Sequence, residues 1–204
     1  MTKIQKAVII GSILGDGFLQ KTGSKNARLR LEHSLKQKEY LIWKCQILGN
    51  YFQSKPQILE RNNPIFDKTY QYIRAQSYSG SELGKLCRLF YIDGKKVIPS
   101  KISDLFKDPL CLAIWFMDDG YYYQRDKIAY LYLPKYNQAS INNLLNVLKV
   151  NFNLAPILKV KKRGEYVLNF SVEETKKLVQ IIKPFVISSM KYKILLESCD
   201  IEIS

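Results

Sequence analysis

Apolar and polar positions follow two different periods along this chain, and the order of those periods repeats. Two largely apolar runs, residues 7–14 and 112–117, lie about half the chain apart. After the first run, residues 27–32 (Ala-Arg-Leu-Arg-Leu-Glu) alternate with the period of two that is typical of a half-buried strand. In residues 37–51, Tyr40, Leu41, Ile47 and Leu48 fall on one stripe of a helix. Each half therefore begins with a buried helix and continues with strands and a second helix.

The same criteria predict the remaining elements. In the first half they predict strands at 57–60 and 70–77 and a short helix at 79–90. In the second half they predict a strand at 127–133, a helix at 141–152, a hairpin formed by 157–162 and 166–171, and helices at 172–182 and 190–196. The fold class is therefore α/β (α+β), with a pseudo-two-fold axis. Asp108-Pro109 is the predicted junction, which divides the chain into repeats 1–108 and 109–204.

Both apolar runs end in the same dipeptide, Asp16-Gly17 and Asp119-Gly120. Gly11 and Gly15 lie on one helical face and leave room for a partner helix to approach closely. If the two helices pack along the pseudo-axis, Asp16 and Asp119 emerge together. Neighbouring carboxylates repel one another unless a cation lies between them, and Mg²⁺ prefers such oxygen ligands. Paired metal ions can activate water and stabilise the leaving oxygen of a phosphodiester.

Composition and charge point to a nucleic-acid partner. The chain has 204 residues, and 32 Lys and Arg against 18 Asp and Glu give a net charge of +14 spread over its length. Its 47% hydrophobic and 12% aromatic content excludes a disordered protein. The single histidine and the absence of a Cys-x-x-Cys pair exclude zinc fingers and zinc deaminases. Cys45, Cys87, Cys111 and Cys199 are predicted to be buried, reduced thiols of an intracellular protein.

The charge-then-apolar order of the N-terminus resembles a signal peptide, but the apolar run stops at Gly15-Asp16-Gly17 without a cleavage site. No stretch approaches the ~18 apolar residues of a membrane span, so no membrane partner is expected.

Rows of alternating charged side chains are candidates for contact with a duplex. Three rows share strand faces, and we predict them as DNA-binding residues: Arg28, Arg30 and Glu32; Tyr70, Tyr72, Arg74 and Gln76; Lys159, Lys161 and Arg163. The alternative is that each row is only the solvent face of its sheet. Which residues contact bases and which contact phosphates is left open. Tyr121 to Arg125 either form a DNA-facing loop or pack their tyrosines into the core.

The two Asp-Gly motifs, together with Trp115-Phe116-Met117-Asp118-Asp119-Gly120, Lys96-Val97-Ile98-Pro99 and Ser189-Met190-Lys191-Tyr192-Lys193, resemble the LAGLIDADG homing endonucleases in their double-motif, single-chain form, and in particular the I-SceI-like branch. The resemblance covers nearly the whole chain. It implies two αββαββα repeats that form a DNA-binding saddle around two central packed helices.

The resemblance also implies roles for residues of the motifs. Asp16 and Asp119 would be catalytic metal ligands for Mg²⁺, and Gly15 and Asp118 would belong to the same metal site, with helix capping or contact with water as the alternative for Asp118. Lys96 and Lys193 would be catalytic lysines beside the metals, with Lys95 and Lys191 as rivals if the register is shifted by a step.

For the whole protein the resemblance implies a monomer that cuts both strands of double-stranded DNA across the minor groove in intron homing. The isoleucine-, lysine- and tyrosine-rich composition fits a mitochondrial or chloroplast gene. Two alternatives stay open: an RNA maturase that assists group I intron splicing, and a non-catalytic DNA-binding regulator.

Three further residues bear on the site. His33 is interpreted as a polar contact to DNA or to the structure and not as a general base, and Trp43 and Trp115 are interpreted as core residues. Pro134 is a departure, because many relatives have a polar pair after this strand, and proline cannot donate a backbone hydrogen bond.

Overall fold

A computed structural model describes residues 1–52, 54–65, 67–161 and 165–194 of the chain. The first repeat contains α1 (Lys3–Leu14), β1 (Phe18–Lys21), β2 (Ala27–Ser34), α2 (Lys38–Leu48), β3 (Gln57–Asn63), β4 (Lys68–Gln76) and α3 (Ser81–Phe90). Short 3₁₀ turns, η1 (Leu35–Gln37) and η2 (Gly49–Tyr51), flank α2. The order is helix, two strands, helix, two strands, helix.

The second repeat has the same order. It contains α5 (Pro109–Asp119), β7 (Gly120–Tyr123), β8 (Ile128–Leu133), α6 (Gln138–Phe152), β9 (Ile157–Val160), β10 (Tyr166–Phe170) and α7 (Val172–Ile182), followed by the 3₁₀ segments η3 (Lys183–Phe185) and η4 (Ser188–Lys193). The ribbon β5 (Tyr91–Ile92) and β6 (Lys95–Lys96) and the short helix α4 (Ile102–Leu105) connect the repeats. The predicted αββαββα pattern is therefore present twice.

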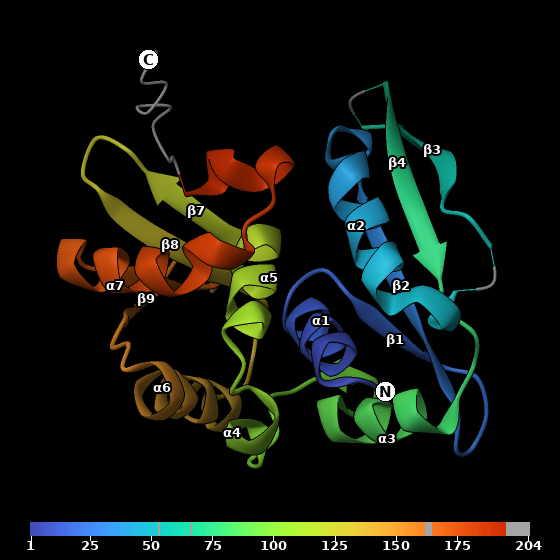
Figure 1. The fold of residues 1–204 in the computed structure, drawn as a ribbon, viewed down its shortest axis with the longest axis horizontal. Helices are drawn as coiled ribbons and strands as arrows, with labels where there is room; N and C mark the ends of the chain where they lie inside the picture. Colours follow the sequence, from blue (N-terminus) through green and yellow to red (C-terminus); the bar gives the residue numbers. More distant parts are fainter. Residues whose placement is uncertain (53, 66, 162–164, 195–204) are drawn as a thin grey trace, which may run out of the picture.

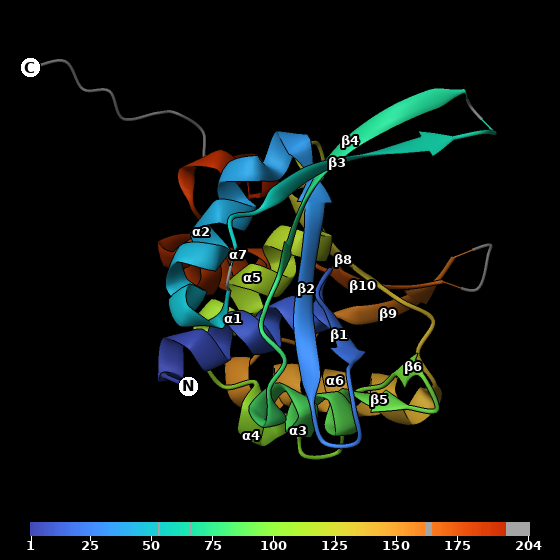
Figure 2. The ribbon, with the colours of Figure 1, turned by 90° about the vertical axis from the view of Figure 1, so that its right-hand side faces the viewer.

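Each repeat folds its four strands into one antiparallel sheet with the same topology. The strand orders are β1-β2-β4-β3 and β7-β8-β10-β9. The two repeats lie side by side with α1 and α5 between them (Figure 1). The hairpins β3–β4 and β9–β10 both extend away from the helices on one side of the molecule (Figure 2). This arrangement is the predicted saddle, with the sheets on the side away from the helices.

The contact between α1 and α5 forms the centre of the molecule. Every residue of α1 from Ala7 to Leu14 is buried, and α5 is buried from Leu110 to Asp118. A Cβ atom at Gly11 would lie 2.6 Å from the main-chain oxygen of Cys111, so only glycine permits this approach without displacement. Asp108 caps α5 by accepting a hydrogen bond from the Leu110 N–H at 2.9 Å. The close helix pair places the two motif ends next to one another.

Several predicted elements differ in detail from the structure. Residues 120–123, expected as part of a loop, form the strand β7, which pairs with β8. The helix expected at 190–196 is the 3₁₀ segment η4 as far as Lys193, and residues 195 and 196 lie outside the described ranges. The short strand β1 lacks the alternation that would have predicted it. β3 and β4 extend farther than expected, because their outer ends are exposed on both faces and show no apolar period.

Among the predicted core residues, Trp115 is fully buried, whereas Trp43 is only partly buried and stacks on Tyr40. Cys111 is buried, but Cys45 and Cys87 are half-buried, so the prediction of buried thiols is wrong for these two. All three are free thiols, and Cys199 lies outside the described residues. Within the described ranges no helix is both long enough and apolar enough to cross a bilayer.

Candidate functional site

The ends of α1 and α5 bring the two motif aspartates to one cavity. Asp16 follows α1 directly after its C-cap, Gly15, and Asp119 is the last residue of α5. A cavity of about 420 Å³ is lined by both carboxylate residues and also by Gly15, Tyr132, Leu133, Pro134, Glu165 and Tyr166. The predicted juxtaposition of Asp16 and Asp119 is therefore present in the structure.

The two aspartates differ in their electrostatic surroundings. Burial, together with the charges of Asp16 and Asp118, raises the pKa of Asp119 to about 7. Burial also disfavours the charged form of Asp16, but the His33 ring and the nearby Lys44 and Lys193 ammonium groups outweigh it and lower the pKa of Asp16. The cavity thus concentrates negative charge that is only partly compensated on the Asp119 side.

Two lysines occupy equivalent positions in the two repeats. The Lys96 ammonium donates to the main-chain oxygens of Gly15 at 2.9 Å and Gly17 at 3.3 Å. The Lys193 ammonium donates to Gly120 at 2.9 Å and Asp118 at 3.3 Å. Each lysine therefore binds the carbonyls on either side of a motif aspartate.

Burial lowers the pKa of both lysines, although the neighbouring aspartates act in the opposite direction. Lys95 and Lys191, the alternative candidates for catalytic lysines, have exposed side chains, whereas those of Lys96 and Lys193 are partly buried.

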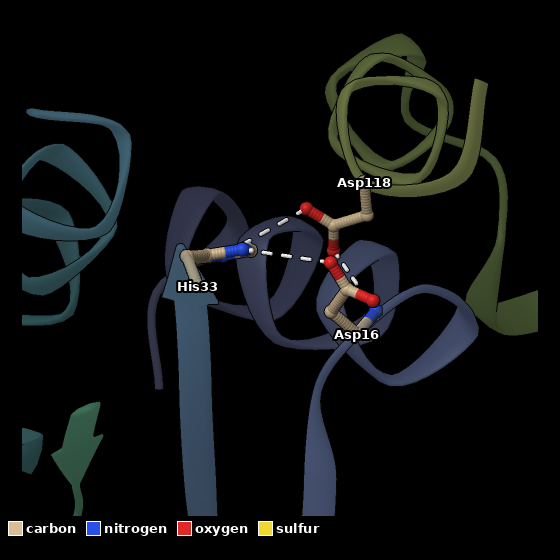
Figure 3. A group of neighbouring side chains, drawn as sticks. All are labelled: Asp16, His33 and Asp118. Carbon is tan, nitrogen blue, oxygen red and sulfur yellow. Dashed lines mark hydrogen bonds and ion pairs between the residues drawn. The ribbon is translucent and has the colours of Figure 1, made fainter. Parts of the chain in front are cut away.

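Asp118 has a different environment from the other acids. Its side chain is completely buried and accepts hydrogen bonds from Lys44 at 2.8 and 3.1 Å and from the Asp16 N–H at 3.2 Å. Gly15 makes room for it, because a Cβ there would lie 2.5 Å from the Asp118 side chain. Asp118 and Asp16 converge with His33, which extends from the end of β2 (Figure 3). Ligand atoms of these three side chains lie within 4.8 Å of one another.

Lys44 and His33 were not predicted as site residues. His33 is only 4% exposed, which excludes a surface contact with DNA and leaves the structural interpretation. Lys44 is fully buried on the apolar face of α2 with Tyr40, Leu41 and Leu48. A lysine at the buried positions of an amphipathic helix requires a partner, and this signal was available in the sequence.

The predicted rows of the first repeat form one continuous surface. Arg30 pairs with Gln76, and Glu32 with Arg74, in the register of β2 and β4, so their side chains share a sheet face. Glu32 accepts hydrogen bonds from Arg74 at 2.8 and 2.9 Å and from Arg61 at 3.1 Å. Arg28 lies on the same face of β2, and Tyr70 and Tyr72 lie along β4. Arg61 and Arg74 also lie over the Tyr72 ring.

On the second repeat, the described residues of the predicted row are Lys159 and Lys161. Lys159 lies on the edge strand β9, and the Lys161 ammonium lies 3.9 Å from the centre of the exposed Tyr132 ring. Arg163 lies outside the described residues. Tyr121 is half exposed on β7, and Pro134 lines the cavity that contains Asp16 and Asp119.

Comparison with known proteins identifies the family. Residues 6–178 match the model of the LAGLIDADG DNA endonuclease family, and this chain belongs to that family.

Three of its relatives cover most of the chain. A probable intron-encoded endonuclease of Wickerhamomyces canadensis is 28% identical over 96% of this chain and 85% of its own length. The cytochrome b mRNA maturase bI2 of Debaryomyces hansenii is 29% identical over 92% of this chain and 72% of its own. A solved structure of the homing endonuclease I-WcaI bound to its DNA recognition sequence has a TM-score of 0.86 at 28% identity, covering 96% of this chain and 88% of that one.

Proposed function

We propose that this chain is a site-specific double-strand DNA endonuclease that hydrolyses phosphodiesters with divalent metal ions held by Asp16 and Asp119. The observation that supports it most is that one carboxylate from each repeat lines a single cavity at the ends of α1 and α5. Membership of the LAGLIDADG DNA endonuclease family supports the same function.

The residues of the cavity fit a hard divalent cation. The available donors are carboxylate and main-chain oxygens, which Mg²⁺ prefers. Burial raises the pKa of Asp119 and the charges of Asp16 and Asp118 raise it further, and a cation would offset both effects. Asp16 and Asp119 would hold the ion, and the Gly15 carbonyl is the candidate main-chain ligand. When bound, Mg²⁺ would supply an activated water and charge stabilisation at the leaving oxygen.

Lys96 and Lys193 supply fixed positive charge next to the aspartates. Their ammonium groups are held at the carbonyls that flank Asp16 and Asp119, so little reorganisation is needed when a phosphate enters. In this proposal they stabilise the negative charge that develops on the phosphate oxygens during hydrolysis.

The exposed sheet faces form the DNA-binding surface of the proposal. Arginine, glutamine and glutamate can distinguish base edges in the major groove, and lysine neutralises phosphates. The residues assigned to this surface are Arg28, Arg30, Glu32, Tyr70, Tyr72, Arg74, Gln76, Lys159, Lys161 and Arg163.

The proposal also includes finer assignments. The chain acts as a monomer, because it contains both halves of the site, and it divides into repeats 1–108 and 109–204. Its ion is Mg²⁺ and its gene is organellar. Its role is intron homing, in agreement with a relative named as intron-encoded.

An RNA maturase on the same scaffold is the second candidate. A relative of similar identity is named a cytochrome b mRNA maturase, and Pro134, which cannot donate a backbone hydrogen bond, lines the cavity. Group I intron RNA is the partner expected for that activity.

A cleavage assay separates the two functions. The substrate is a supercoiled plasmid with the sequence formed by joining the two flanks of the host intron, incubated with Mg²⁺ or with EDTA. We expect linear plasmid with Mg²⁺ only, and no linear product from Asp16→Asn or Asp119→Asn, with DNA affinity within about tenfold of the unmodified chain. Tight binding of intron RNA without plasmid cleavage would favour the maturase, and full cleavage by either variant would contradict the site assignment.

A further inference from the structure

A fully buried cation lies beside Asp16, and the proposed hydrolysis does not use it directly. The Lys44 ammonium contacts both Asp118 oxygens at 2.8 and 3.1 Å and the His33 Nε2 at 3.2 Å. It also lies 4.2 Å from the centre of the Tyr40 ring. These contacts use the three N–H groups of the ammonium, and they fill the space between Asp118 and His33 with a cation that belongs to the protein.

Lys44 determines which nitrogen of His33 holds the proton. An ammonium group can only donate, so the Nε2 atom that faces it must accept, and the proton of the neutral ring then lies on Nδ1. His33 Nδ1 points towards Asp16, with 3.5 Å between it and Oδ2. Among the described residues this buried nitrogen has no closer hydrogen-bond partner. With Lys44 at its Nε2, His33 therefore directs an N–H group at the Asp16 carboxylate. Figure 3 shows the His33 ring facing Asp16 and Asp118.

Lys44 also acts on Asp16 through Asp118. The Asp118 carboxylate that Lys44 holds accepts the main-chain N–H of Asp16 at 3.2 Å. Two residues thus position Asp16: Asp118 on α5 binds its main-chain N–H, and His33 on β2 faces its carboxylate. Lys44 on α2 contacts both of these residues. Asp118 in this network has its charge compensated by Lys44 and does not need a metal ion.

The network exists on one side of the pseudo-two-fold axis only. Phe18 and Tyr121 each lie two residues after a motif aspartate, and they pair with Arg30 and Tyr130 in the neighbouring strands. His33 and Leu133 each lie three residues farther along those strands, so they are equivalent positions. The buried faces of α2 and α6 match, with Lys44 at the position of Leu144. Asp118 corresponds to Gly15, because each precedes its motif aspartate. Asp119 therefore has apolar equivalents, Leu133 and Leu144, where Asp16 has polar supports.

We propose that Lys44 is a positioning residue for Asp16, acting through His33 and Asp118, and that it supports cleavage of one DNA strand more than the other. The strand-specific part rests on the proposed endonuclease function. The positioning part does not, because the state of His33 can be measured without DNA or metal.

The first experiment measures the tautomer of His33 by ¹⁵N NMR of the untagged protein. His33 is the single histidine of the chain, so its two ring nitrogens give unambiguous signals. We expect a proton on Nδ1 in the unmodified protein and a shift towards the Nε2 tautomer in Lys44→Met. A proton on Nε2 in the unmodified protein, or no change in the variant, would overturn the positioning role even if the protein cuts no DNA.

The second experiment measures single-turnover cleavage of each end-labelled strand of a target duplex. For Lys44→Met we expect one strand to be cut at least tenfold more slowly and the other to stay within about threefold. Leu144→Met, at the equivalent position of the other repeat, is the matched control and should leave the ratio of the two rates unchanged. An equal fall for both strands would indicate a purely structural role and would overturn the proposal, as would two unchanged rates.

A double variant keeps the test valid if Lys44→Met fails to fold. Lys44→Leu with Asp118→Ala removes both buried charges and makes the surroundings of Asp16 more like the apolar surroundings of Asp119. We expect it to fold, to keep the rise in melting temperature that Mg²⁺ causes, and to show the same loss on one strand. Loss of the Mg²⁺ effect would show that Asp118 is a metal ligand and would overturn this assignment.

Discussion

Individual residues at the cavity have opposite effects on stability as the pH changes. The pKa of Asp119 is about 7 in the folded protein and near 4 in an unfolded chain. Between these values the folded state binds a proton that the unfolded state has lost, so the metal-free protein becomes less stable as the pH rises. Asp16 has a lowered pKa, and it therefore contributes stability that is present above about pH 4 and lost as the pH falls below it.

These signs predict opposite results for two matched variants in EDTA. Asp119→Asn should be more stable than the unmodified chain by ~1 kcal/mol at pH 5 and by on the order of a few kcal/mol at pH 8, because each pH unit between the two pKa values of Asp119 corresponds to ~1.4 kcal/mol. Asp16→Asn should be less stable at both values. Urea unfolding measures both, and an Asp119→Asn variant without a gain at pH 8 would contradict the electrostatic description of the cavity.

Some residues of the site could be predicted from the sequence and others could not. Asp16, Asp119, Lys96 and Lys193 belong to repeated motifs, so a second copy signals each of them. Lys44 falls on the apolar stripe of α2, which signals a buried cation, but its partners could not be predicted, because Lys44 and His33 have no polar copy in the other repeat.

At the scale of elements, the crossing of α1 and α5 sets the separation of the two aspartates. A methyl group at Gly11 would collide with the main-chain oxygen of Cys111 and with the Ile114 side chain. We expect Gly11→Ala to destabilise the protein by ~1–3 kcal/mol, the usual cost of overpacking a core, and to reduce DNA cleavage at least tenfold because both motif ends move. Gly23→Ala is the control, since a Cβ there has no neighbour within 4 Å. Similar unfolding midpoints for the two variants would contradict this description of the helix pair.

Elements with a buried face could be predicted, and those without one could not. The helices α1, α5 and α6 and the strand β2 were evident from apolar runs or periods, because one face of each packs on the core. β1 and β7 are four residues long and begin beside the motif glycines, so they are too short to show a period. The outer parts of β3 and β4 pair only with each other and are exposed to solvent.

At the scale of the whole molecule, the net charge of +14 predicts binding to DNA that weakens steeply with salt. Lys159→Ala should reduce the slope of log affinity against log salt by about one, because it removes one phosphate contact.

Glu32→Gln should act in the opposite sense and increase affinity for random-sequence DNA, because it frees Arg61 and Arg74 from their ion pairs. Fluorescence anisotropy over a salt series measures both. Weaker binding of random DNA by Glu32→Gln would contradict the assignment of this surface.

The central claim is that the two repeats jointly bind divalent ions with Asp16 and Asp119. A crystal structure of the DNA complex with Mn²⁺ tests it most directly, because the anomalous signal locates the ions. We expect anomalous peaks beside the Asp16 and Asp119 carboxylates and none between Asp118 and His33, where the Lys44 ammonium lies. A peak between Asp118 and His33, or no peak at Asp119, would contradict it.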